Sequence, residues 1–97
     1  MKIKWSPLSI DRLTSIVNYI SQDKPNAAKN IADTIFKAVE RLKDFPQSGR
    51  VVPELENPKY REILIKNYRV IYSILEDVIY IITIRHQIQL LSLNNIK

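Results

Sequence analysis

The side chains best able to do chemistry at neutral pH lie between positions 54 and 86. His86 is the only histidine, so any imidazole acid or base must be this residue. Arg69 lies in an apolar and aromatic stretch, where a guanidinium could bind phosphate through two parallel hydrogen bonds. Glu54 lies in a proline-containing connection and could act as a base. These three residues are the candidates for acid–base chemistry on a phosphate ester.

Other basic and aromatic residues accompany these three. Arg61, Lys66, Arg85 and Tyr68 lie on or beside the same predicted strands, and we expect them to bind an RNA backbone or another target. The alternative is that the arginines are solvated or paired with carboxylates such as Glu62. The tyrosines would then be ordinary aromatic residues of a sheet.

The loop between the last two predicted strands decides which of these side chains can act together. A two-residue turn at 76–77, or a four-residue loop of the same parity, puts His86 on the side of Arg69 and turns Arg85 to the other face. A three-residue loop would bring Arg85 to the side of Arg69. Because Glu-Asp is a poor pair for a type I′ turn, the four-residue loop is favoured, and the predicted couple is Arg69 with His86.

Composition limits the kinds of site that the chain can build. Without cysteine it has no disulfide and no thiolate ligand, and one histidine alone does not make a metal site, so we expect neither metal nor cofactor. Gly49 is the only glycine, which excludes glycine-rich phosphate loops. No apolar run is long enough for a signal peptide or a membrane span, so we expect a cytoplasmic protein without a membrane partner. The net charge of +5 is only a weak indication of an anionic partner.

The remaining residues supply the elements that must position these side chains. Ser6-Pro7 and Pro25 are typical helix starts, and the apolar residues after each recur every three or four positions. Predicted strands cover 2–5, 60–66, 68–75 and 78–85, predicted helices cover 7–21 and about twenty residues before Pro46, and an irregular connection covers 47–59. The tail, 87–97, could be a short helix or an added strand. The prediction is one α+β domain over 1–97, ordered β-α-α-β-β-β, with a helix hairpin packed on a twisted, mainly antiparallel sheet.

Several segments of the chain, taken in order, also indicate a resemblance to a known family. They are WSPLSIDRL, YISQDKPNAA, FPQSGRVVPEL, YREILIKNYRVIYSI and DVIYIITIRHQ. Together they resemble the RelE/ParE superfamily of bacterial toxins from type II toxin–antitoxin systems, and the resemblance covers nearly the whole chain. It implies a growth-inhibiting toxin of the plasmid stabilisation type. It also implies a cognate antitoxin, partly disordered, that wraps the helix hairpin and sheet in a hetero-oligomer.

The resemblance leaves the molecular target open. RelE-like members cut messenger RNA in the ribosomal decoding site, and the arginine that they use matches Arg69 in NYRVIY. Relatives similar to YoeB add a glutamate and a histidine, for which Glu54 and His86 can stand. Tyr60 and Glu62 occupy the places of two RelE lysines. The first hypothesis is therefore a metal-independent, ribosome-dependent endoribonuclease, and the alternative is a ParE-like, non-enzymatic inhibitor of DNA gyrase.

Overall fold

The computed structural model describes residues 1–89, 91 and 92 of the chain. The elements are β1 (Lys2–Trp5), α1 (Pro7–Ser21), α2 (Pro25–Glu40), a short 3₁₀ helix η1 (Arg41–Lys43), β2 (Arg50–Val51), β3 (Tyr60–Ile65), β4 (Tyr68–Leu75) and β5 (Val78–His86). The predicted order and fold class are confirmed. One element was missed, because the connection that was expected to be irregular contains the two-residue strand β2.

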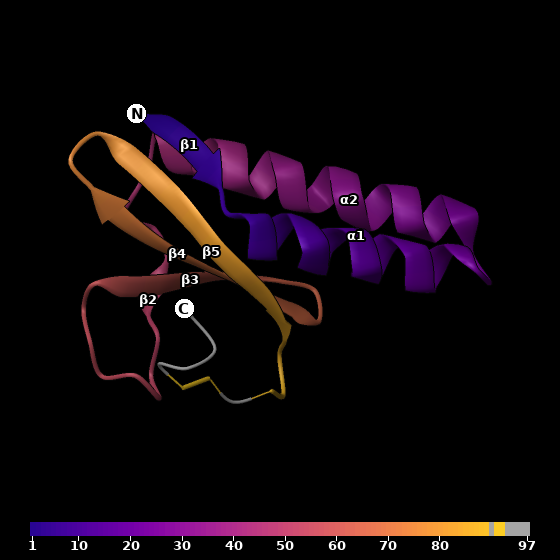
Figure 1. Cartoon of the computed structure of the whole chain (residues 1–97). Coiled ribbons are helices and arrows are strands. Elements are labelled where there is room, and N and C mark those ends of the chain that lie inside the picture. Colours follow the sequence, from indigo (N-terminus) through magenta and orange to yellow (C-terminus); the bar gives the residue numbers. More distant parts are fainter. Residues whose placement is uncertain (90, 93–97) are drawn as a thin grey trace.

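The helices begin where the sequence indicates. The Ser6 hydroxyl accepts a hydrogen bond from the Ser9 amide at 2.9 Å, and Pro7 occupies the first turn, where no helical hydrogen bond is lost. The same hydroxyl donates to the Ile82 carbonyl at 2.7 Å, so the start of α1 is tied to β5. Helix α2 ends at Glu40 and tightens into η1 before Pro46. Figure 1 shows the two helices side by side on one side of the sheet.

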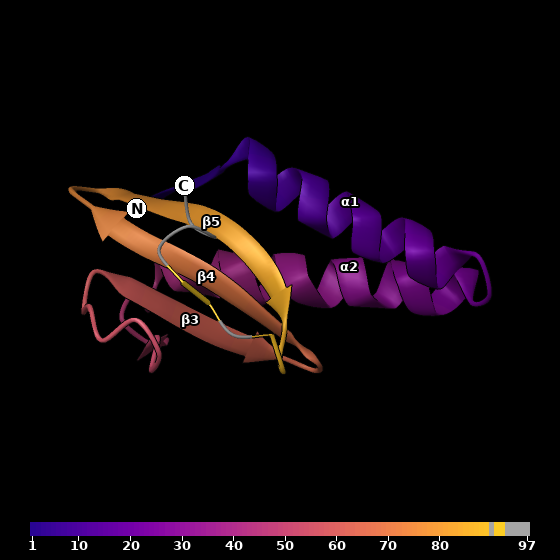
Figure 2. The same ribbon diagram turned by 60° about the horizontal axis from the view of Figure 1, so that its bottom comes forward.

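The sheet has five strands in the order β1-β5-β4-β3-β2. The N-terminal strand β1 is an edge strand and pairs in parallel with β5, whereas the other pairs are antiparallel. The sheet is thus mainly antiparallel, as expected, and its strands twist across one another in Figure 2. The face toward the helices carries the main core, which includes Ile35, Val39, Val70, Tyr72 and Ile81.

The register between β4 and β5 corrects the prediction about which side chains share a face. The turn has two residues, because Leu75 pairs with Val78, so the favoured four-residue loop is wrong. A two-residue turn alone would put His86 on the side of Arg69, but a bulge changes this arrangement further along the strands. There Tyr72 pairs with Ile81, and the next pair is Ile71 with Thr83. Ile82 is the extra residue, and one extra residue moves all later side chains to the opposite face.

The bulge has a physical cause at the junction of β1 and α1. The Ser6 amide donates to the Ile81 carbonyl at 2.9 Å, and the Ser6 hydroxyl donates to the Ile82 carbonyl. In a regular strand, successive carbonyls point in opposite directions. Here the two bonds hold the successive carbonyls of Ile81 and Ile82 toward the start of α1. Two residues that were expected on opposite faces, Arg69 and Arg85, are therefore direct cross-strand partners.

The second face of the sheet, away from the helices, is covered by the connection after β2 and by Leu91. Val52, Ile71 and Leu91 form a small buried cluster there, with Leu55 and Tyr60 packed against it. Residues 87–89 form turns and bends, so the described start of the tail is neither helix nor strand, and 90 and 93–97 lie outside the described residues. None of the described helices is long and apolar enough to cross a membrane.

Candidate functional site

The guanidinium of Arg69 is the centre of a buried ion-pair network on the second face. Its Nη1 and Nη2 donate to the two carboxylate oxygens of Glu54 at 2.6 and 2.7 Å, a bidentate pair. Its Nε donates to Glu62 Oε1 at 2.6 Å, and Nη1 also donates to the Gln89 carbonyl at 3.0 Å. Arg69 is only 4% exposed. The structure therefore brings Arg69 together with Glu54, as predicted for the site. The positive charge of the guanidinium and the negative charge of the carboxylate neutralise each other.

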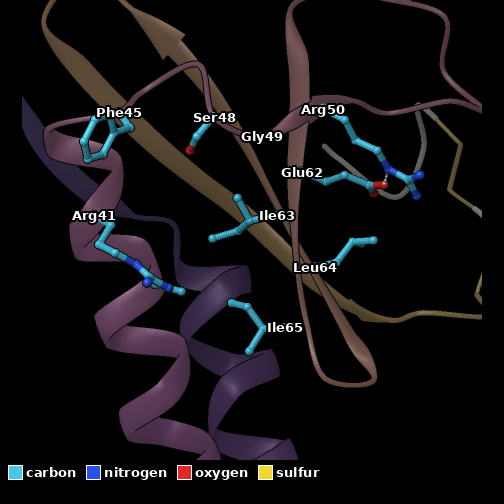
Figure 3. Close-up of a pocket in the computed structure, with 10 residues that line it drawn as sticks. Arg41, Phe45, Ser48, Gly49, Arg50, Glu62, Ile63, Leu64 and Ile65 are labelled. Carbon is cyan, nitrogen blue, oxygen red and sulfur yellow. Dashed lines mark hydrogen bonds and ion pairs between the residues drawn. The ribbon is translucent and has the colours of Figure 1, made fainter.

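Glu62 is a buried carboxylate held between two arginines. Its second oxygen accepts from Arg50 Nε at 2.6 Å, and its side chain is fully buried, whereas that of Arg50 is 56% exposed. Figure 3 shows Arg50 and Glu62 turned toward each other beside β3. The alternative that the strand arginines are paired with carboxylates such as Glu62 is confirmed for Arg69. Arg50 was missed, because its pairing depends on β2, for which the sequence has no signal.

Glu54 connects this network to the C-terminal segment. One of its oxygens also accepts a hydrogen bond from the Leu91 amide at 3.1 Å. The hydrogen bonds from Arg69 lower the pKa of Glu54 from 4.5 to about 2, against a smaller effect of burial. In return, Glu54 and then Glu62 raise the pKa of Arg69. Glu54 is thus a firmly ionised carboxylate at neutral pH.

His86 lies on the other face of the sheet, so the predicted couple of Arg69 with His86 is wrong. The bulge at Ile82 makes His86 the cross-strand partner of Tyr68, and the two rings meet edge to face with centroids 5.8 Å apart. Tyr68 packs against the main core. The Nδ1 atom of His86 accepts from the Ile88 amide at 3.3 Å.

The other predicted binding residues do not form one surface. Arg61 pairs across the strands with Tyr72 on the helix side, and its Nη1 donates to the Gly49 carbonyl at 2.7 Å. Lys66 is exposed in the turn after β3, with a positive φ of 53°. Arg85 lies beside Arg69 on the second face. Only Arg69, Glu54 and Arg85 therefore share a face. Within the described residues, no group of histidine and carboxylate side chains could hold a metal ion.

A cleft of about 500 Å³ opens beside this network, at the edge of the sheet. It lies between η1, the connection and β3, as Figure 3 shows. Its lining includes Arg41, Phe45, Arg50, Leu64 and Ile65. Phe45 and Leu64 are 64% and 43% exposed, so the cleft presents apolar as well as basic groups.

The fold, a helix hairpin on a five-stranded sheet, matches that of a solved toxin–antitoxin protein. A chromosomal ParDE toxin–antitoxin system from P. aeruginosa has a chain of the same fold, with a TM-score of 0.75 and 20% identity over 89% of this chain and 95% of that one. The family model of the ParE toxin of the type II toxin–antitoxin system parDE matches residues 3–91. The chain therefore belongs to the ParE toxin family.

Sequence relatives carry related descriptions. Toxin RelE2 of Caulobacter vibrioides is 29% identical over 90 residues, which cover 92% of this chain and 98% of the relative. Putative toxin Y4kP of Sinorhizobium fredii is 39% identical over 49 residues, about half of each chain. Together with the family model and the fold, the match to Toxin RelE2 confirms the predicted membership of the RelE/ParE superfamily.

Proposed function

We propose that this toxin stops growth by binding a protein target, DNA gyrase, and that it does not cut messenger RNA. The observation that carries the proposal is the closed pairing of Arg69 with Glu54 and Glu62. Gyrase is the target that the resemblance to ParE-like toxins implies, and membership of the ParE family agrees with it. We also propose that the toxin acts in the cytoplasm with an antitoxin as its partner.

Arg69 has few donors left for a phosphate. A guanidinium has five N–H groups, and Arg69 makes four hydrogen bonds with them, to Glu54, Glu62 and the Gln89 carbonyl. A nuclease would need this charge to be available to the phosphorane-like transition state. Here two carboxylates already neutralise it, and its side chain is only 5% exposed. These contacts support a structural role for Arg69.

The two proposed proton carriers are also badly suited to work together. A general base is most effective when its pKa lies near the working pH, whereas the pKa of Glu54 is about 2. His86 lies on the opposite face of the sheet, so it cannot reach the same reacting phosphate as Glu54. Both observations favour an inhibitor that works by binding.

The proposal is tested by comparing two assays of the purified toxin. The first measures supercoiling by DNA gyrase, and the second measures translation and the integrity of messenger RNA with intact ribosomes. The expected result is inhibited supercoiling with uncut messenger RNA. Ribosome-dependent cuts in the messenger RNA, or normal supercoiling at a large excess of toxin over gyrase, would overturn the proposal.

A further inference from the structure

The second half of β3 is an open edge of the sheet. Strand β2 pairs with the first half of β3 only, so no described strand lies outside residues 63–65. The Val52 amide donates to the Tyr60 carbonyl, so the peptide groups of Tyr60 point to the outer side of β3. Because this direction alternates along an antiparallel strand, the N–H and C=O of Leu64 also point outward. Leu64 therefore presents a backbone donor and acceptor that no described strand uses.

The cleft of about 500 Å³ opens along this edge. Its lining includes Ile63, Leu64 and Ile65 from the strand and Phe45, which follows η1. In Figure 3, Ile63 and Ile65 turn toward the helices, whereas Leu64 turns the other way. Proteins often protect an edge strand with proline or lysine, but neither occurs at 63–65. The edge is therefore open to a further strand.

Two arginines beside the cleft have guanidinium N–H groups that are not committed. Arg41 is exposed and forms no ion pair with any described residue. Arg50 uses Nε for its pair with Glu62, and its side chain is 56% exposed. Figure 3 shows Arg41 on the helix side of the cleft and Arg50 on the other side of β3. The open edge thus has positive charge on both sides, which complements a ligand with negative charges.

We propose that a short, extended, acidic segment of the toxin's protein target adds to the sheet along the free half of β3. The N–H and C=O of Leu64 would form two backbone hydrogen bonds with it, as in other cases of strand addition. Side chains of a strand alternate between faces, so one set would meet Phe45 and Arg41 and the other Leu64 and Arg50. This inference rests on the proposed function, because the segment belongs to gyrase.

Two other occupants fit this edge less well. Two copies of the toxin paired through β3 would bring Arg41 and Arg50 of each copy toward the same arginines of the other, and like charges repel. The phosphate backbone of a nucleic acid offers only acceptors, so it would leave the outward C=O of Leu64 without a donor. An acidic peptide in an extended conformation supplies both the charge and the backbone partners.

Leu64→Pro tests the backbone hydrogen bonds. It removes the outward N–H, and it breaks no bond between β3 and β4 because the Leu64 peptide groups point away from β4. It should raise the toxin concentration that half-inhibits supercoiling by gyrase about tenfold or more. Leu64→Thr keeps the N–H and should stay within about threefold of the wild type. Urea unfolding checks that both variants fold.

Arg41→Glu tests the charge complementarity at an exposed position where the fold is not at risk. An acidic segment would then meet a like charge, so the half-inhibiting concentration should rise about tenfold. Lys29→Glu is the matched control, because it makes the same change in net charge at an exposed position of α2 that does not line the cleft. The control should stay within about twofold of the wild type.

Hydrogen exchange at single-residue resolution locates the contact directly. In the free toxin the Leu64 amide should exchange quickly, whereas the amides of Ile63 and Ile65, which point toward β4, should exchange slowly. Addition of gyrase should slow the exchange of the Leu64 amide about tenfold or more. An unchanged Leu64 amide in toxin that is saturated with gyrase would overturn the proposal.

The supercoiling assay separates this proposal from the proposed function. If the wild type inhibits gyrase and both Leu64→Pro and Arg41→Glu inhibit it equally well, the strand addition is wrong and gyrase remains the target. If the wild type itself does not inhibit gyrase, both proposals fall. The expected result is inhibition by the wild type, Leu64→Thr and Lys29→Glu, with weaker inhibition by Leu64→Pro and Arg41→Glu.

Discussion

The Tyr72 hydroxyl and the backbone of Gly49 are in direct contact beneath the connection. The hydroxyl accepts a hydrogen bond from the Gly49 amide at 3.0 Å and donates to the Pro46 carbonyl at 2.8 Å. A Cβ at position 49 would lie 2.5 Å from that hydroxyl and 2.6 Å from the Glu62 carbonyl. The chain's only glycine is therefore required by this close approach, which anchors the connection to β4.

Gly49→Ala should destabilise the toxin, because one of the two clashing groups is backbone and cannot rotate away. We expect a loss of about 2 kcal/mol in the free energy of unfolding, as for other overpacked sites. The measurement is urea unfolding followed by circular dichroism. The control is Ser48→Ala at the exposed neighbouring position, which should change little. Equal midpoints for the two variants would show that the contact with Tyr72 can relax.

Acid should weaken the fold through Glu54. Its pKa is lowered from 4.5 to about 2 in the folded chain, so its contribution to stability is present above pH 4.5 and is lost as the pH falls toward 2. A difference of that size is worth at most about 3 kcal/mol, because the Glu54 side chain is partly exposed and solvent screens its pairing with Arg69. Glu54→Gln should be less stable than the wild type at pH 7 and should show a flatter decline between pH 4.5 and 2. Parallel curves for the two proteins would contradict the assignment.

The ion-pair network should be replaceable as a set but not in parts. Removing Arg69 alone, as in Arg69→Met, leaves two neighbouring carboxylates, of which Glu62 is fully buried, without their shared cation and should cost about 3 kcal/mol or more. Replacing Glu54, Glu62 and Arg69 together by leucine, methionine and methionine should restore stability to within about 2 kcal/mol of the wild type.

The same triple variant separates a structural role of Arg69 from a catalytic one. A toxin that works by binding should keep inhibiting gyrase in the supercoiling assay once the fold is restored. If the triple variant unfolds like the wild type but has lost all toxicity, the charges of Arg69 and its partners act in function. Its fold is checked by comparing near-ultraviolet circular dichroism with that of the wild type.

The turn between β4 and β5 offers a stabilising change. Glu76 has a φ of 56°, in the left-handed region that side chains with a Cβ adopt at a cost. Glu76→Gly should therefore raise the free energy of unfolding by about 0.5 to 1 kcal/mol, measured by urea unfolding. Glu76→Ala keeps the Cβ and the strain, so it should give no comparable gain. A glycine variant no more stable than the alanine variant would contradict this explanation.

Local signals in the sequence were enough to determine the two helices, every strand except β2, and the family. Ser6-Pro7 and Pro25 begin the helices, Lys2–Trp5 is a strand, and the segments from Tyr60 onward form three more strands, because caps, proline and period-two patterns act over a few residues. The order of these elements was enough for the resemblance to the toxin superfamily. Glu62 could be named as a partner for the strand arginines because it is a carboxylate on the same predicted strand.

Only the tertiary structure decided which functional side chains meet. The bulge at Ile82 depends on hydrogen bonds from Ser6, more than seventy residues away in sequence, and no local pattern encodes it. That single extra residue separates His86 from Arg69 and brings Arg85 beside it. Side-chain direction alternates with every residue of a strand, so an error of one residue in register reverses a prediction about a site while the fold stays correct.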